Sequence, residues 1–339
     1  MTGRGPVTVP GQDLRPSGWP DRNAAPGPAA IVAAELVKTY PGGVQAVRGI
    51  SFSVAAGESF GLLGPNGAGK TTTIGMLNTT VRPTSGRALL AGHDVQADPM
   101  GARRVSSVVF QDSVVDRPLT GRQNLRLHLR LWRVPKAEGL ARLAELTEAV
   151  GLASLLDRPV ATYSGGERRR LEIVRALLSA PRVLFLDEPT VGLDTRIRHD
   201  LFDTIAALRE RTGVTVLLTT HYLDEAERLC DRLAIIDGGR IVACDTPARL
   251  LADLGEAILE LRVAGDPAVA LAALRADGLP GDGAVVIGGT VTIPLRGFPP
   301  SRAMELASRL DVPVRELVTR VPTLDDVYLR LTGNRISPE

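Results

Sequence analysis

The stretch Gly64-Pro65-Asn66-Gly67-Ala68-Gly69-Lys70-Thr71 matches the pattern G-x-x-x-x-G-K-[ST] in full. The residues before it, 58–63, are predicted to form a short strand, and those after it, to about residue 78, a helix. Glycines allow consecutive backbone N–H groups to turn inward around an anion, and the start of the helix adds partial positive charge. The alternative, an ordinary glycine-rich turn, does not account for these flanking elements. We therefore interpret residues 64–71 as a phosphate-binding loop.

The side chains at the end of this loop have separate tasks. Lys70 reaches the β- and γ-phosphates, and the hydroxyl of Thr71 is a ligand for Mg²⁺. Thr72 is placed to donate a further hydrogen bond to phosphate. These residues in this order predict a site for a nucleoside triphosphate.

Two carboxylates end a second apolar run. Val183–Leu186 is predicted to be a buried strand, and Asp187 and Glu188 follow it directly. The carboxyl ends of parallel strands face the ligand crevice, which brings Asp187 to the phosphate-binding loop as a ligand for Mg²⁺. Glu188 points differently and is the candidate that polarises an attacking water. A solvated strand end is the alternative, and the phosphate-binding loop in the same chain argues against it.

One histidine has a setting that suits this chemistry. His221 follows the predicted buried strand 214–219, where an imidazole donates to the γ-phosphate or orients the water and Glu188. The other three histidines have no comparable setting and are interpreted as surface or hydrogen-bonded residues: His93, His128 and His199.

Strand and helix patterns alternate along the first two thirds of the chain, which indicates an α/β fold with a largely parallel central sheet. Residues 31–39 and 47–54 read as strands, and 195–211 as an amphipathic helix. Residues 119–180 are predominantly helical and are predicted to form an inserted lobe. A hairpin at 233–243 closes this part of the chain.

The last third has a different order of elements. From Ile258 to Thr319 the patterns predict β-α-β-β-α-β, which fits a small ferredoxin-like α+β domain. A final helix is predicted to begin at Thr323, where Thr323 and Asp326 can form a capping box.

Composition limits the class of protein. The chain has 339 residues, of which 44% are hydrophobic and 23% charged, so it is long enough for two or three globular domains. Forty basic and 38 acidic side chains leave a net charge of +2, which excludes a strong general nucleic-acid binder, and no nucleic-acid partner is expected. The two cysteines, Cys230 and Cys244, cannot form a disulfide framework or a four-cysteine metal site.

The beginning of the chain differs from the rest. Residues 1–30 contain six prolines and five glycines and are predicted to be a disordered leader. The chain has no run of eighteen apolar residues and no basic-then-apolar signal region. These features predict a cytosolic protein unless a partner carries it to a membrane.

A further segment, Tyr163-Ser164-Gly165-Gly166-Glu167, lies between the phosphate-binding loop and the acidic strand end. With Gln111 after a strand at 105–110, the motifs stand in the order found in nucleotide-binding subunits of ATP-binding-cassette (ABC) transporters, which residues 31–250 resemble. The resemblance implies an ABC-type P-loop fold with a mixed sheet core, ATP and Mg²⁺ as cofactors, and ATP hydrolysis as the activity.

The resemblance also implies roles for individual residues. Tyr40 would stack on adenine, and Asp194 would contact nucleotide. Three residues would hold Mg²⁺: Thr71, Gln111 and Asp187. Catalysis would rest on Glu188 and His221.

The segment Ser164-Gly165-Gly166 also has a reading from its residues alone. A glycine-bearing loop at the start of a helix is a second anion site, and a simple helix cap with Glu167 in a capping box is compatible with it. In the family, two subunits pack head-to-tail, so Ser164 and Gly166 of one would close over the γ-phosphate held by Lys70 of the other. Tyr163 and Glu167 depart from the usual leucine and glutamine. Glu167 either weakens closure or faces Arg169 or Arg170.

A narrower resemblance rests on residues 111–125 and 324–333, which are similar to those of daunorubicin-resistance-like export ATPases of bacteria. It implies a separately encoded permease of the ABC-2 type, contacted by Gln111 and the lobe around 112–135, at the cytoplasmic face of the membrane. The domains implied are an ABC ATPase domain at 31–254, with a helical subdomain at about 112–180, and a small accessory domain at 255–339.

Two other functions compete with this interpretation. A soluble cassette ATPase acting in translation, repair or assembly is the alternative, but the single cassette and the lack of sustained heptads argue against it. A nucleotide sensor that does not hydrolyse would lack a base, whereas Glu188 is present. For an exporter, hydrophobic drugs, lipids and glycans all fit as cargo.

Overall fold

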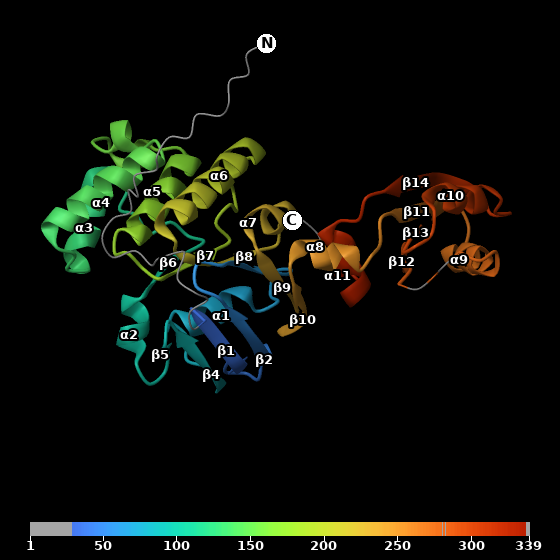
Figure 1. Cartoon of the computed structure of the whole chain (residues 1–339), viewed down its shortest axis with the longest axis horizontal. Helices are drawn as coiled ribbons and strands as arrows, with labels where there is room; N and C mark the ends of the chain where they lie inside the picture. Colours follow the sequence, from blue (N-terminus) through green and yellow to red (C-terminus); the bar gives the residue numbers. More distant parts are fainter. Residues whose placement is uncertain (1–28, 280, 282, 337–339) are drawn as a thin grey trace, which may run out of the picture.

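The computed structural model describes residues 29–279, 281 and 283–336. The predicted leader 1–30 therefore lies outside the described residues apart from its last two positions. The described elements form three sheets with helices packed on them (Figure 1).

The central sheet has six strands in the order β10-β9-β3-β8-β7-β6, and all neighbours are parallel except β10 and β9. The α/β fold with a largely parallel central sheet is thus confirmed. The strands are β3 (Ser59–Leu63), β6 (Ser106–Val109), β7 (Val183–Asp187), β8 (Thr215–Thr220), β9 (Arg232–Asp237) and β10 (Arg240–Asp245).

A second sheet is antiparallel and has the order β2-β1-β4-β5. Its strands are β1 (Ile31–Thr39), β2 (Gln45–Val54), β4 (Ser85–Leu90) and β5 (His93–Asp94), and the short helix α2 (Pro99–Arg104) follows them. Helix α1 (Lys70–Leu77) shares one buried apolar cluster with strands of both sheets, through side chains such as Ile74 and Leu77 beside Leu36 and Phe60.

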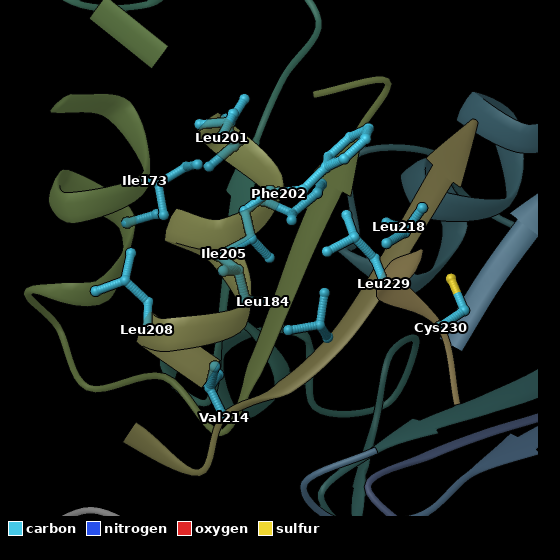
Figure 2. Close-up of a cluster of buried hydrophobic side chains, with 14 of the residues drawn as sticks. Ile173, Leu184, Leu201, Phe202, Ile205, Leu208, Val214, Leu218, Leu229 and Cys230 are labelled. Carbon is cyan, nitrogen blue, oxygen red and sulfur yellow. The ribbon is translucent and has the colours of Figure 1, made fainter. Parts of the chain in front are cut away.

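The opposite face of the central sheet is covered by α5 (Gly165–Leu177), α6 (Thr195–Thr212) and α7 (Leu223–Leu229). The apolar stripe of α6, which includes Leu201 and Ile205, packs over Leu184 of β7 and Leu218 of β8 (Figure 2). Burying a leucine or isoleucine side chain in this way stabilises the fold by about 1.5–3 kcal/mol. This packing fixes the position of the loops that end β7 and β8.

The segment 119–180 is predominantly helical, as predicted, and α3 and α4 lie beside this face (Figure 1). It consists of α3 (Gly121–Leu131), α4 (Lys136–Ala149), two short 3₁₀ helices, η1 (Ala153–Leu155) and η2 (Val160–Thr162), and α5. Thr120 caps α3 with a full capping box, because its hydroxyl accepts from the backbone of Gln123 and the Gln123 side chain accepts from Thr120 N.

After α8 (Pro247–Ala252) the chain forms a third sheet with the order β12-β13-β11-β14, all antiparallel. The elements are β11 (Ile258–Val263), α9 (Pro267–Ala276), β12 (Val285–Ile287), β13 (Thr290–Pro294), α10 (Pro300–Ser308), β14 (Val314–Arg320) and α11 (Leu324–Thr332). They have the predicted order β-α-β-β-α-β, followed by a helix with the predicted capping box at Thr323 and Asp326. No helix in the described ranges is long and apolar enough to cross a membrane.

Candidate nucleotide-binding site

The phosphate-binding loop connects β3 to α1, and two of its glycines are required by close backbone contacts. A Cβ on Gly64 would lie 2.2 Å from the carbonyl oxygen of Ile236. A Cβ on Gly69 would lie 2.4 Å from the carbonyl oxygen of Ala46, and Gly69 has φ +103°. The loop therefore packs closely against β9 and the start of β2. The side of the loop that faces away from these strands is open to solvent.

Lys70 is almost fully buried, with 4% of its surface exposed. Its Nζ donates to the carbonyl oxygens of Gly64 at 2.8 Å and Pro65 at 3.0 Å. It also lies 3.1 Å from Oε1 of Glu188. The buried ammonium is therefore held by the loop and neutralised by Glu188, the residue predicted to activate water.

Asp187 lies behind the loop, at the end of β7. Its Oδ1 accepts hydrogen bonds from Thr71 at 3.1 Å and from Thr219 at 2.6 Å. The hydroxyl of Thr71 and the carboxylate of Asp187 are hard oxygen donors of the kind that suits Mg²⁺, as is the side-chain amide oxygen of Gln111. No group of three or more His, Cys, Asp or Glu side chains suited to a metal occurs in the described part of the chain.

Glu188 has a backbone conformation that few side chains adopt, with φ +43°. Its backbone N–H donates to Thr219 Oγ1 at 3.0 Å, which ties it to β8. Nδ1 of His221 lies 3.5 Å from Glu188 Oε1 and has no hydrogen-bond partner within the described ranges. Strain and an unpaired buried nitrogen at one place mark a site where another group is expected to bind.

These residues surround an open cavity of about 580 Å³. Ten of its lining residues are ones that the sequence analysis selected: Tyr40, Asn66, Gly67, Gly69, Lys70, Thr71, Thr72, Gln111, Glu188 and His221. Gly64, Pro65, Ala68 and Asp187 are not among the lining residues. Tyr40 is 37% exposed, and its hydroxyl lies 3.5 Å from Thr72 Oγ1, so its ring is available at the outer edge of the cavity.

Four lining residues were not predicted: Val44, Ala46, Val191 and Tyr222. Val44 and Ala46 lie in the turn and strand that follow Tyr40, where an apolar pair beside an exposed aromatic was the available signal. Tyr222 follows His221, and the two rings lie 4.1 Å apart between centroids.

The remaining predicted residues lie at the starts of the helices α5 and α6. Ser164, Gly165, Gly166 and Asp194 do not line this cavity. Gly165 lines a smaller cavity of about 170 Å³, which shares Gln111 with the first. Asp194 is the N-cap of α6, and its carboxylate accepts from Ile197 N at 2.9 Å.

The start of α5 forms the capping box that the residues allow. Ser164 Oγ accepts from Glu167 N at 3.2 Å, and Glu167 Oε2 accepts from Ser164 N at 2.7 Å. This hydrogen bond from the Ser164 backbone lowers the pKa of Glu167, and Arg158 and Arg170 add positive charge. Tyr163 is buried and donates its hydroxyl to the carbonyl of Leu155 at 2.6 Å, so it replaces leucine without leaving its polar end unpaired.

Arg169 is not the partner of Glu167, which corrects one of the two alternatives. It is buried and pairs with Glu172 at 2.9 Å. It also donates to the backbone oxygens of Pro189 at 2.6 Å and Phe110 at 2.5 Å. Arg169 therefore joins the segments that follow β6 and β7, a role hidden in the sequence because it stands in a run of three arginines.

The interpretation of His128 as a surface or hydrogen-bonded residue is wrong. Burial beside Arg175 lowers its pKa to about 4, and its Nε2 has no partner among the described residues. It lines a separate cavity of about 340 Å³ between α3 and the central sheet, with Asn78, Trp132 and Arg175. The other two histidines agree with the prediction, since His93 contacts Asp98 and His199 contacts Arg228.

Comparison with known proteins gives one consistent picture. Residues 47–191 match the family model described as ABC transporter. The daunorubicin/doxorubicin resistance ATP-binding protein DrrA of Streptomyces peucetius is 43% identical, over 90% of this chain and 93% of its own. The Nod factor export ATP-binding protein I of Ralstonia nicotianae is 38% identical, over 91% of this chain and 96% of its own.

Solved structures agree at the level of the fold. The cbiO1 subunit from Clostridium perfringens, part of the ABC transporter complex cbiONQ, has a TM-score of 0.62 at 27% identity and matches 66% of this chain and 91% of its own. An ATP-binding subunit of another ABC transporter has a TM-score of 0.59 at 30% identity and matches 66% of this chain and 92% of its own.

Proposed function

The chain belongs to the ABC transporter family as an ATP-binding subunit, and we propose that its 580 Å³ cavity binds and hydrolyses Mg-ATP to power export through a separate membrane permease. The observation that carries the proposal is the convergence of Lys70, Glu188 and His221 from three loops on one cavity. A soluble cassette ATPase is not favoured, because similar proteins over nearly the whole chain include export and drug-resistance subunits.

The triphosphate is held by the loop 64–72. Backbone N–H groups of the loop and the start of α1 supply the anion site, and Lys70 supplies the positive charge. Tyr40, at the outer edge of the cavity, stacks on the adenine ring. Bound phosphate competes with Glu188 for Lys70, so nucleotide releases the carboxylate that the 3.1 Å ion pair holds in its absence.

Thr71, Asp187 and Gln111 are the residues that would hold Mg²⁺. The ion, when bound, neutralises charge on the β- and γ-phosphates. Asp187 is already oriented for this task by Thr71 and Thr219, so it needs little reorganisation.

Glu188 accepts the proton of the attacking water, and His221 holds the γ-phosphate and the water in line with it. Their separation of 3.5 Å supports a joint role, since one water lying beside both atoms can donate to Glu188 and contact the ring nitrogen of His221. The φ of +43° at Glu188 keeps its side chain turned toward the cavity rather than along the strand.

A second copy of this chain completes the site. Ser164 and Gly166 lie outside the chain's own cavity, at the start of α5, which suits an anion, so a head-to-tail dimer brings them to the partner's γ-phosphate. Such a dimer has two identical sites, and ATP binding closes it while hydrolysis reopens it.

The permease partner is of the ABC-2 type, and Gln111 with the lobe around 112–135 faces it at the cytoplasmic side of the bacterial membrane. The names of two relatives support a cargo class, since they refer to daunorubicin/doxorubicin resistance and to Nod factor export. We therefore expect a drug-like, lipid or other hydrophobic substrate.

Glu188→Gln tests the proposal directly. We expect phosphate release to fall about a hundredfold or more, because the amide cannot accept the proton of water. We also expect ATP to hold this variant as a dimer in light scattering, since binding persists without hydrolysis. Hydrolysis at the parental rate would refute the role of Glu188, and a monomer with bound ATP would refute the dimer.

A further inference from the structure

A buried acidic side chain outside the cavity joins the two segments that carry Glu188 and His221. Glu225, in α7, has none of its surface exposed. Its Oε2 accepts a hydrogen bond from the hydroxyl of Thr220, the last residue of β8, and lies 3.4 Å from the hydroxyl of Thr190. Thr190 follows Glu188 by two residues, and Thr220 directly precedes His221. One carboxyl oxygen therefore contacts both loops.

The contacts of Thr220 extend this link to the histidine ring. Thr220 Oγ1 accepts from Tyr222 N at 2.8 Å, which leaves the Thr220 hydroxyl hydrogen for Glu225. The ring of Tyr222 lies 4.1 Å from that of His221 and is covered on α6's side by Arg198 at 3.9 Å. The backbone and the aromatic neighbour of His221 thus both depend on this network.

Burying this network lowers the stability of the folded state, which argues that Glu225 has a role beyond packing. Burial raises the pKa of Glu225 to about 8, with Thr220 and Arg198 opposing the rise and Asp224 adding to it. Oε1 of Glu225 has no hydrogen-bond partner among the described residues. A buried polar atom without a partner destabilises a protein, and an apolar side chain would fill the same space without that cost.

We propose that Glu225 is a positioning residue for ATP hydrolysis, which holds the turn of His221 against the segment 188–190 through Thr220 and Thr190. The inference rests on the proposed function of Glu188 and His221. Without the link, the two loops keep their strands and the bond from Glu188 N to Thr219, but lose the side-chain contacts that join Thr190 to Thr220.

Three variants and a matched control test this. Glu225→Leu removes both hydrogen bonds and fills the space, and Glu225→Gln keeps an acceptor oxygen for both threonines. Thr190→Val removes one end of the link. Glu227→Leu changes an exposed glutamate on the same helix. We expect kcat to fall about tenfold in Glu225→Leu and about threefold in Thr190→Val, with KM for ATP nearly constant, and to stay near the parental value in Glu225→Gln and Glu227→Leu.

Histidine NMR separates positioning from a general loss of folding and does not depend on hydrolysis. The chain has four histidines, so ¹³C-labelled histidine gives four Cε1–H signals, and His221→Ala identifies the one of interest. We expect Glu225→Leu to shift or broaden the His221 signal and to leave those of His93 and His128 in place. Glu225→Gln restores the parental position.

The outcomes distinguish the two claims. An unmoved His221 signal in Glu225→Leu, or a fall in kcat that matches a loss of ATP-binding protein, overturns the role of Glu225. Parental kcat in Glu225→Leu overturns it as well. If the parent releases no phosphate with or without its permease, the function proposed for the cavity fails, while the NMR result still decides whether Glu225 positions His221.

Discussion

At the scale of single residues, two glycines of the phosphate-binding loop share a positive φ but have different surroundings. Gly69 has φ +103° and the carbonyl oxygen of Ala46 only 2.4 Å from the place of a Cβ. Gly67 has φ +80° and no atom within 4 Å of that place. The first position excludes any side chain by contact, whereas the second carries only the cost of its backbone conformation.

The pair gives a matched prediction. We expect Gly67→Ala to lower the free energy of unfolding by about 1–2 kcal/mol, the cost of a left-handed alanine. Gly69→Ala should cost about 3 kcal/mol or more, because the loop must move away from β2. Urea titrations of both variants measure this. Equal losses of unfolding free energy in the two variants would contradict this. They would mean that the loop moves away from Ala46 at little cost and is less closely packed than we describe.

At the scale of elements, the negative charge of Glu167 stabilises the start of α5. The carboxylate of Glu167 accepts from Ser164 N, and this bond lowers its pKa below the ordinary value of 4.5. A lowered pKa means that the folded state favours the ionised form. The stabilisation is therefore complete above pH 4.5 and is lost as the pH falls through the lower pKa of the folded state.

Glu167→Gln tests this sign and the effect on closure together. We expect the variant to be less stable than the parent by about 0.5–1 kcal/mol at pH 7, with the difference shrinking as the pH falls toward 3. Glu316→Gln, at an exposed strand position, should show no such change and serves as the control. The lost negative charge should also let ATP close the dimer at a lower concentration. A difference that grows on acidification would contradict the hydrogen-bond account.

The elements that sequence could predict are those with a local signal. Each of these elements shows a motif or an apolar period within its own residues: the loop 64–71, the strand before Asp187 and the apolar stripe of α6. β4 gave no such signal, since only Ala88 and Leu90 of its six residues are buried and its partner β1 lies far back in the chain. The helix α2 has six residues and no full amphipathic period.

In the candidate site, too, the sequence predicted the residues that stand in motifs and missed those whose roles depend on tertiary contacts. Lys70, Thr71 and Glu188 were found because each stands in a motif. Arg169 and Glu225 were missed because their roles come from tertiary contacts: Arg169 reads as one arginine of three, and Glu225 as one acid of a polar helix. His128 was misjudged for the same reason, since only the packing of α3 beside Arg175 on α5 buries it.

At the scale of the whole molecule, the apolar side chains of the last helix pack in the cluster of the central sheet and not in the cluster of the third sheet. Leu324, Val327 and Tyr328 of α11 lie in the same apolar cluster as Leu250 of α8 and residues of the central sheet. The Tyr328 hydroxyl donates to Asp237 at the end of β9 at 2.8 Å. The strands and helices between β11 and β14 have their own cluster around residues such as Leu259 and Leu274. The chain thus returns to the nucleotide-binding part after completing the third sheet.

This arrangement predicts which core substitutions weaken nucleotide binding. Tyr328→Ala and Leu274→Ala each remove a buried side chain, at a cost of about 3–5 and 2–5 kcal/mol. We expect Tyr328→Ala to lower the temperature at which ATP binding is lost by about 10 °C, because it weakens the core that carries β9 and the phosphate-binding loop. Leu274→Ala should leave that temperature unchanged and affect only the third sheet. Thermal scans followed by a fluorescent ATP analogue and by circular dichroism distinguish the two. If Leu274→Ala releases nucleotide as early as Tyr328→Ala does, the two cores unfold together, and α11 is one part of a single cooperative unit.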